Sequence, residues 1–337
     1  MRILILGANG FIGSHLSEAI LQQTDWHIDA MDLTQDKISH LLDFPRFSFF
    51  KGDMTKEKDW IKTKMAECDV VLPLVAIAQP MVYVKDPLKV FELDFEANLQ
   101  VIRLCVELKK RLIFPSTSEV YGMCPDSEFD EEKSYLVTGP IHKERWIYGT
   151  SKQLLDRLIY VYGKHEGLSY TLFRPFNWYG PRLDNVLNPK PGGSRVLTQF
   201  IGNILREEPI HLVNGGAQKR CFTYVEDGIN ALLLMIDNKN NCAHNKIFNV
   251  GNPKENFSIR TLAEMLIQSI IHDYPQYASK AKSATLIDVD AKTYYGEGYQ
   301  DVTLRVPSIS RAKQDLGWIP KIDMTVGLGK TLDFYLA

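Results

Sequence analysis

A tyrosine and a lysine four residues apart, Tyr148 and Lys152, form the pattern in this sequence that most directly indicates a chemistry. Residues at this spacing lie one turn apart on the same face of a helix. Because an ammonium group stabilises a phenolate, we expect Lys152 to lower the pKa of Tyr148 from its usual value of about 10. Tyr148 is then a candidate general base for a substrate hydroxyl that Ser118 would hold. A nucleotide would receive the hydride.

The same spacing occurs a second time, at Tyr160 and Lys164. The two tyrosines lie on one predicted helix, where about 18 Å would separate them. Only one of them can therefore meet the cofactor. Because only Tyr148 is accompanied by the other candidate groups, we expect no catalytic role for Tyr160.

A glycine-rich segment follows the first predicted strand and begins a predicted helix. Glycines at such a turn allow the backbone to approach a pyrophosphate closely, and the amino end of the helix faces the phosphates. A glycine triplet by itself could be an ordinary turn, but the order strand, turn and helix favours nucleotide binding. The predicted contacts here are Gly7, Asn9, Gly10, Phe11, Ile12 and Gly13.

Two carboxylates are placed to select the cofactor. Asp32 ends the second predicted strand, where it would accept hydrogen bonds from the adenosine ribose and repel a 2′-phosphate, so NAD is favoured over NADP. Asp53 follows the third predicted strand and could meet the adenine amino group. The alternative for Asp53 is a helix cap.

The elements that must position these groups alternate between strands and helices. Short apolar strands are predicted at 2–6, 28–31, 47–50, 70–74, 111–115 and 170–174, with helices at 11–21, 91–108 and 148–164. This alternation predicts an α/β fold, a Rossmann-type doubly wound parallel sheet covered on both faces. After residue 174 we expect helices at about 195–206 and 225–236, a strand at 246–250 and a helix from 258.

We therefore predict two domains. Residues 1–175 form an NAD-binding Rossmann domain, and residues 176–337 form a smaller, interleaved carboxy-terminal substrate lobe. Parts of that lobe, about 221–250, return to the Rossmann domain.

Composition excludes several other classes of protein. The 337 residues are 45% hydrophobic and 24% charged, and 39 Lys and Arg nearly balance 41 Asp and Glu, which favours neither nucleic acid nor an anionic membrane as partner. No apolar run approaches the roughly 20 residues that span a bilayer, and the sequence opens on a predicted strand instead of a signal peptide. The five cysteines and eight histidines lack metal-ligand spacing. We expect a cytoplasmic protein with reduced thiols and no metal site.

An anionic ligand must therefore be bound by a local group of cations. The candidates are Arg182, Arg195, Lys219 and Arg220, because guanidinium groups bind phosphates in bidentate geometry. Taken singly, each would more often be a solvated surface charge, and the run Lys219–Arg220 is the best candidate. Asn98, among apolar neighbours, either braces the backbone of the active site or is a surface amide.

At these motifs the sequence resembles the extended short-chain dehydrogenase/reductases that act on nucleotide sugars. Within them it is similar to one branch, the UDP-glucuronic acid decarboxylase (dehydrogenase) domain of the bifunctional polymyxin-resistance protein ArnA. The resemblance covers about residues 2–336. It is carried by PLVAIA at 73–78, VFELDF at 90–95, FPSTSEVYGM at 114–123, RWIY at 145–148, SKQLLDR at 151–157, FRPFNW at 173–178, GPRLDN at 180–185, QKRCFT at 218–223 and YYGEGYQDV at 294–302.

The resemblance implies NAD-dependent oxidative decarboxylation of UDP-glucuronic acid to UDP-4-keto-pentose (UDP-β-L-threo-pentopyranos-4-ulose), CO2 and NADH. It implies proton transfer by Glu119 and Arg305, and NAD contacts from Asp32, Asp53 and Met54. Leu74 and Ala76 are also predicted to contact NAD, together with Tyr148 and Lys152. The implied UDP-sugar contacts are Ala78, Tyr83, Thr117, Ser118, Arg145, Asn177, Lys219, Arg220 and Tyr299.

The resemblance further implies a homo-oligomer, at least a dimer, that pairs through helices 91–108 and 148–164, and a role in lipid A modification and polymyxin resistance. Three departures stand out. His211 occupies a position of the uridine-proximal segment that the family fills with lysine, the loop 187–193 is altered, and we expect the fused formyltransferase domain to be missing. Formylation of the downstream amino sugar would then need another protein.

Several alternatives stay open. Arg305 is too weak an acid to protonate carbon readily, so it is either a clamp for the substrate carboxylate or a surface ion pair. Glu119 either relays a proton or caps the backbone. For the whole protein, the alternatives are a UDP-xylose synthase, a nucleotide-sugar 4-epimerase or 4,6-dehydratase, and a non-catalytic NAD(H)-sensing regulator.

Overall fold

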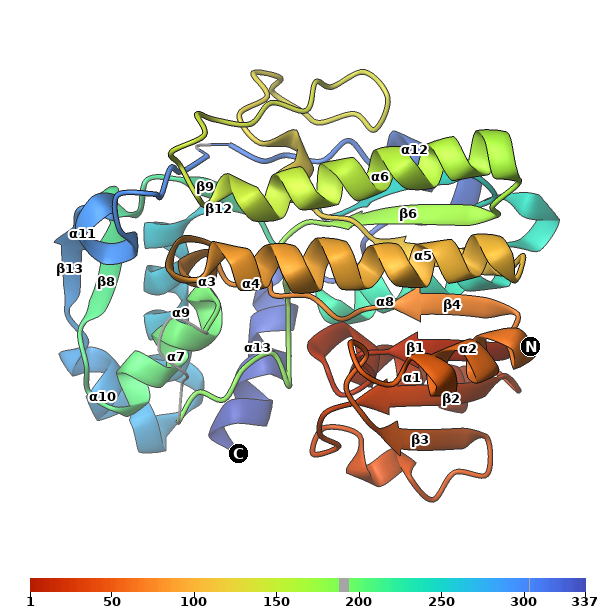
Figure 1. Cartoon of the computed structure of the whole chain (residues 1–337). Helices are drawn as coiled ribbons and strands as arrows, with labels where there is room; N and C mark the ends of the chain where they lie inside the picture. Colours follow the sequence, from red (N-terminus) through yellow and green to blue (C-terminus); the bar gives the residue numbers. More distant parts are fainter. Residues whose placement is uncertain (188–193, 303) are drawn as a thin grey trace.

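The fold is built on one sheet of seven parallel strands. The computed structural model describes residues 1–187, 194–302 and 304–337, so most of the predicted loop change at 187–193 lies outside the described residues. The sheet order is β3 (Phe47–Lys51), β2 (His27–Asp32), β1 (Arg2–Leu6), β4 (Val70–Pro73), β5 (Arg111–Pro115), β6 (Tyr170–Pro175) and β11 (Lys246–Val250) (Figure 1). The predicted Rossmann-type doubly wound α/β fold is confirmed.

Helices cover both faces of this sheet because its strands are apolar on both sides. Along β1, Ile3 and Ile5 face one buried cluster while Leu4 and Leu6 face the other. The first cluster includes side chains of α1 (Phe11–Gln23), α8 (Val225–Asp237) and α12 (Ser310–Leu316). The second includes side chains of α2 (Lys58–Glu67), α5 (Asn98–Glu107) and α6 (Trp146–Glu166).

The helix predicted at 91–108 is in fact three segments, which corrects the sequence prediction. The segments are α4 (Pro87–Phe91), a π-helical turn η2 (Glu92–Ala97) and α5. The amide of Asn98 donates to the carbonyl oxygens of Leu93 at 3.1 Å and of Asp94 and Val75 at 3.4 Å. Two of these carbonyls belong to the π-helical turn and the third to the segment after β4, so one amide ties the turn to that segment. Such turns occur often at functional sites. Asn98 is buried and braces the backbone, so it is not a surface amide.

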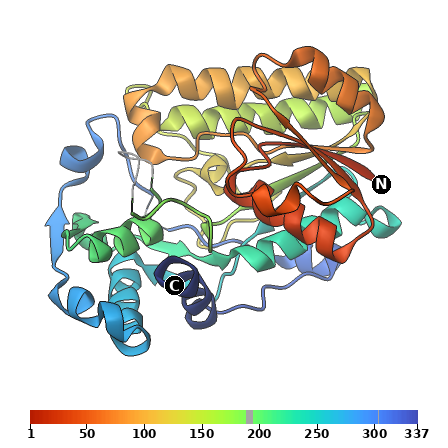
Figure 2. The same cartoon turned by 90° about the horizontal axis from the view of Figure 1, so that it is seen from below.

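The remaining elements gather beyond the carboxyl ends of the strands, toward which the arrowheads of the sheet point (Figures 1 and 2). Short strand pairs are β7 (Trp178–Tyr179) with β10 (Thr223–Tyr224), β8 (Ile210–Val213) with β13 (Leu286–Val289), and β9 (Lys219–Cys221) with β12 (Asn256–Ser258). The helices of this lobe are α7 (Val196–Leu205), α9 (Ile259–Asp273), α10 (Ala278–Ser283), α11 (Ala291–Tyr295) and α13 (Met324–Leu336).

Two further short helices lie near the ends of the sheet strands, α3 (Pro80–Lys85) after β4 and the 3₁₀ turn η3 (Ser118–Tyr121) after β5. Other 3₁₀ turns are η1 (Ser39–Leu41), η4 (Asn214–Gly216), η5 (Lys239–Asn241) and η6 (Pro275–Tyr277). Within the described residues, no helix is both long and apolar enough to cross a membrane.

Candidate active site

The turn between β1 and α1 has the geometry that a dinucleotide phosphate needs. Gly7 has a φ of 92°, a conformation that suits glycine, and its backbone amide donates to the carbonyl oxygen of Met31 at 2.8 Å. A Cβ on Gly13 would lie 2.2 Å from the carbonyl oxygen of Gly7, so the helix passes the turn closely. The turn also lies where the strand order reverses, between β1 and β4. Ligands of open α/β sheets bind at this point, and the turn fits NAD.

Asp32 is fixed at the end of β2 by backbone groups. Its carboxylate accepts from the backbone amides of Asn9 at 2.8 Å and Leu33 at 2.7 Å. Burial raises the pKa of Asp32, and the backbone amides partly oppose that effect. The side chain of Asn9 donates to Asp36 at 2.8 Å, so a second carboxylate stands beside Asp32. Sequence reasoning missed Asp36, although an acidic residue four positions after Asp32 was a visible signal.

The other predicted NAD contacts lie at the ends of neighbouring strands. The carboxylate of Asp53 accepts from the backbone amide and the hydroxyl of Thr55, at 2.9 and 2.8 Å. Since α2 begins only at Lys58, Asp53 closes a turn and does not cap that helix. Met54 is buried in the core beneath α2. The backbone amide of Leu74 donates to Leu6 at 2.7 Å, and Ala76 follows in the segment between β4 and α3.

Tyr148 is buried near the start of α6, with 5% of its surface exposed. Its ring stacks on that of Tyr83 at 4.7 Å. Burial raises the pKa of Tyr148 well above its usual value, the charge of Asp94 raises it further, and a hydrogen bond with Thr117 lowers it. Tyr160 is 53% exposed, in keeping with the view that only Tyr148 is placed for catalysis.

Burial raises the pKa of Tyr148 in this structure, so the expected lowered pKa is not found, and any effect of Lys152 is smaller than that of burial. The Nζ atom of Lys152 lies 6.0 Å from the centre of the Tyr148 ring. It donates instead to the carbonyl oxygen of Pro115 at 3.2 Å and lies 3.8 Å from a carboxylate oxygen of Asp94. Pro115 and Asp94 therefore position the lysine. Burial of the phenol has the largest effect on the pKa of Tyr148.

Glu119 lies between two buried arginines. Arg145 contacts one carboxylate oxygen at 2.5 Å and Arg305 donates to the other. Burial disfavours the ionised form, but the two guanidinium groups outweigh it and hold the pKa of Glu119 at about 2. Arg305 is buried and is not part of a surface ion pair, and the Glu119 carboxylate binds side chains instead of capping backbone. The alternatives of a surface ion pair for Arg305 and a backbone cap for Glu119 are thus wrong.

Two short segments hold Glu119 and Arg305 in place. The turn η3 begins directly at Ser118, which is buried, and Thr117 accepts from the backbone amide of Glu119 at 3.2 Å. The irregular stretch around Arg305 is held by a hydrogen bond from the backbone amide of Phe129 to the carbonyl oxygen of Val306, at 2.7 Å. Residues far apart in sequence thereby meet at one carboxylate.

Arg145 presents donors that remain available to an anion. Its Nε and Nη1 atoms are buried and have no hydrogen-bond partner within the described parts of the chain. Its guanidinium lies 5.5 Å from the ring of Tyr299, which stacks on Tyr295 at 4.0 Å. The neighbouring Arg220 donates to Asp301 at 2.7 Å. Tyr295 and Asp301 were not predicted as site residues, although both lie inside the motif at 294–302.

The predicted phosphate-binding cations divide into two groups. Arg182 donates to Glu18 on α1 at 2.5 Å, and Arg195 pairs with Asp184 at 3.1 Å. These two arginines lie near each other, since both lower the pKa of Lys37. Arg220 instead lies with Arg305 beside Glu119. The structure therefore does not bring all four cations to one place, and Lys219 is exposed on β9.

Three other predicted sugar-nucleotide contacts lie on separate elements. The amide of Asn177 donates to the carbonyl oxygen of Cys221 at 3.1 Å, and its φ is 40°. His211 stands on β8 with its ring 6.2 Å from that of Tyr294. Ala78 lies between β4 and α3.

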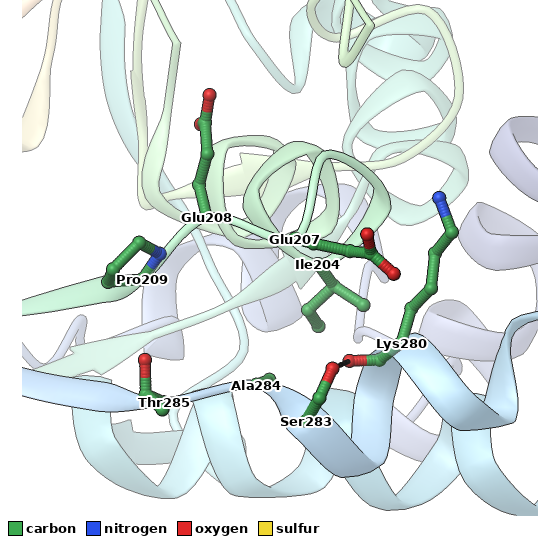
Figure 3. A pocket seen from close by; sticks show the side chains of 8 residues that line it. All are labelled: Ile204, Glu207, Glu208, Pro209, Lys280, Ser283, Ala284 and Thr285. Atoms are coloured by element: carbon green, nitrogen blue, oxygen red, sulfur yellow. Dashed lines mark hydrogen bonds between the residues drawn. The ribbon is translucent and has the colours of Figure 1, made fainter.

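The structure also shows a hollow of about 440 Å³ on the lobe (Figure 3). It is lined by Glu207, Glu208 and Lys280 among others, and it lies between α7, β8 and α10, which carry none of the predicted catalytic residues. Lys280 donates to the carbonyl oxygen of Leu205 and so closes the end of α7. Among the residues that the structure describes, no cluster of His, Cys, Asp and Glu could hold a metal ion.

The fold and this site define a Rossmann-type enzyme with a dinucleotide turn and a buried tyrosine and lysine. Residues 3–251 match the NAD dependent epimerase/dehydratase family. The chain belongs to this family.

The chain is also similar to solved structures. A PbgP3 protein from Burkholderia pseudomallei is 51% identical with a TM-score of 0.90, and the match covers 99% of this chain and 96% of that one. A UDP-glucuronic acid 4-epimerase from Bacillus cereus, solved with UDP-glucuronic acid and NAD, is 26% identical with a TM-score of 0.82 over 100% and 99% of the two chains. A dTDP-glucose 4,6-dehydratase from Bacillus anthracis, 20% identical with a TM-score of 0.79 over 100% and 96%, shares the fold.

Proposed function

We propose that this enzyme oxidises UDP-glucuronic acid with NAD and decarboxylates it to UDP-4-keto-pentose. The observation that carries the proposal is the position of Glu119, whose carboxylate is held between Arg145 and Arg305 directly after Ser118. A glucuronate carboxylate resembles the Glu119 carboxylate in charge and shape. The same arginines can therefore bind it, and Nε and Nη1 of Arg145, which have no hydrogen-bond partner among the described residues, are donors that a second carboxylate could engage.

The chain's residues have distinct roles in this reaction. Tyr148, as a phenolate, removes the proton of the C4 hydroxyl, and bound NAD supplies the hydride acceptor. Because burial raises the pKa of Tyr148, this step depends on nearby positive charge, which Lys152 and the oxidised nicotinamide would supply. The carboxylate is then β to a ketone, so carbon dioxide can leave through an enolate. In this proposal the hydroxyls of Ser118, Thr117 and Tyr148 stabilise the developing oxyanion. The three residues are buried, and Thr117 forms a hydrogen bond with Tyr148.

The last step is protonation of C5, which constrains Glu119. With its pKa at about 2, Glu119 carries no proton near neutral pH. It can therefore relay only a proton that it first receives from another donor, such as water. Arg305 orients the carboxylate and stabilises its charge until the bond to C5 breaks.

The proposal extends to the remaining parts of the molecule. Residues 1–175 bind NAD, and residues 176–337 bind the sugar nucleotide except for about 221–250, which return to the first domain. Two copies pair through the outer faces of α5 and α6. The keto product would feed lipid A modification and polymyxin resistance.

The test is a mass balance with UDP-glucuronic acid labelled at C6. We expect one NADH and one labelled carbon dioxide for each substrate consumed, with the 4-keto pentose identified by NMR. Complete conversion to UDP-xylose with catalytic NAD would favour a UDP-xylose synthase and overturn the proposal.

A second candidate is 4-epimerisation of the same substrate, favoured by the structural similarity to the UDP-glucuronic acid 4-epimerase. Epimerisation requires the same oxidation at C4 but returns the hydride and keeps the carboxylate. The same experiment separates the two, because an epimerase forms UDP-galacturonic acid and releases no labelled carbon dioxide.

A further inference from the structure

Lys152 is a fully buried cation, and a buried ammonium requires a counter-ion. Two carboxylates lie near enough to influence its charge, Asp94 and Asp156. Asp156 already forms an ion pair with Arg174: one of its oxygens accepts from Arg174 at 3.0 Å and from Ser116 at 2.7 Å, while its other oxygen has no hydrogen-bond partner in the described chain. Asp94 is thus the carboxylate left to balance Lys152.

Asp94 itself is held by the π-helical turn. It is completely buried, and one of its oxygens accepts from the backbone amide of Ile77 at 3.0 Å. Its other oxygen lies 3.8 Å from Nζ of Lys152 and has no hydrogen-bond partner in the described chain. The Ile77 amide belongs to the segment between β4 and α3 that we predict to contact both NAD and substrate. One carboxylate therefore joins Lys152 to that segment.

We propose that Asp94 is a positioning residue for the reaction: it holds the ammonium group of Lys152 next to Tyr148 and sets the charge that Tyr148 experiences. This inference rests on the proposed role of Tyr148 as the base. It adds a residue for which the sequence motifs indicated no role.

The charge balance predicts the direction of a pH effect. Two titratable groups face Asp94: Lys152 on α6 and Tyr83 on α3. Three carboxylates act on Tyr148: Asp94, Glu119 on η3 and Asp156 on α6. Arg145 lies beside Glu119. A negative charge raises the pKa of every group near it, so removing the Asp94 charge lowers the pKa values of both Tyr148 and Lys152. Burial raises the pKa of Asp94 to about 6, so wild type and a neutral variant should converge below that pH.

The experiment compares Asp94→Asn with wild type, using kcat/KM for UDP-glucuronic acid oxidation across pH. Asparagine can still accept from Ile77 but carries no charge. We expect the plateau of kcat/KM to fall on the order of 10- to 100-fold in the variant, because Lys152 is less well positioned. We also expect the acid limb of the pH profile to move to lower pH. Glu96→Gln, an exposed change on the same turn, is the charge-matched control and should leave both unchanged.

A lower plateau with an unmoved acid limb would mean that Asp94 is only structural, and a wild-type profile would also overturn the inference. If wild type does not oxidise UDP-glucuronic acid at all, the proposed function fails first.

The pairing of Asp94 with Lys152 is then tested by urea unfolding of Asp94→Asn, Lys152→Met and the double variant. Each single change leaves a buried charge unbalanced, so we expect the double variant to be more stable than additivity predicts. Additive losses would refute the pairing.

Discussion

At the scale of single residues, we expect Glu119 and Arg305 to matter more for decarboxylation than for substrate binding. Glu119→Gln and Arg305→Met should each abolish carbon dioxide release while weakening UDP-sugar binding far less, because Arg145 and the nucleotide contacts remain. The measurements are labelled carbon dioxide release and calorimetric titration with UDP-glucuronic acid. Full decarboxylation by both variants would show that the two residues are structural.

Tyr148 provides the second residue-scale prediction. Tyr148→Phe keeps the ring that stacks on Tyr83 but removes the base, so oxidation should fall by several orders of magnitude with NAD affinity little changed. Stopped-flow NADH formation and NAD titration measure the two effects. The control is Tyr160→Phe on the exposed side of α6, which should be almost silent. Near-wild-type turnover in Tyr148→Phe would remove Tyr148 from the mechanism.

Asp32 predicts the choice of cofactor. The protein should use NAD far better than NADP, and Asp32→Ala should narrow the difference because the repulsion of a 2′-phosphate decreases. The neighbouring Asp36 keeps one negative charge nearby, so we expect the preference to narrow without reversing. Steady-state kinetics with both cofactors test this. Equal efficiency in wild type would show that Asp32 does not face the ribose.

At the scale of elements, the π-helical turn depends on one amide. Asn98→Ala removes the donor to three buried or partly buried carbonyl groups and should destabilise the protein by about 1–3 kcal/mol. It should also reduce turnover, since the turn carries Asp94. Urea unfolding measures the stability, with Gln100→Ala, exposed on α5, as control. Equal stability of the two variants would contradict the bracing role.

At the scale of the whole molecule, α5 and α6 lie side by side on one outer face (Figures 1 and 2). On α6, Leu154 and Val161 are 46% and 47% exposed and lie seven residues apart, on the same face of the helix. If two copies pair there, the double variant Leu154→Glu and Val161→Glu should change a dimer into a monomer in sedimentation velocity. Leu234→Glu on α8, which covers the opposite face of the sheet, is the control. Dimers that persist in the α6 double variant would place the interface elsewhere.

The sequence by itself determined the sheet and the chemistry of α6. The strands of the sheet are continuous apolar runs whose alternate residues fill two cores, and such runs are recognisable without any partner. The spacing of Tyr148 and Lys152 fixes their common helix face for the same reason, because both depend only on local backbone geometry. The glycine turn after β1 is equally local.

Only the tertiary structure decided which charges meet. Arg305 reaches Glu119 across 186 positions of sequence, and Lys152 faces Asp94 across the gap between two helices. Neither pairing has a local signal, because both arise from the packing of segments against the ends of the strands. The same packing buries Tyr148, and its desolvation overrides the effect that the lysine spacing predicts. Local geometry thus specified the reacting groups, whereas their protonation depends on the neighbours that folding brings to them.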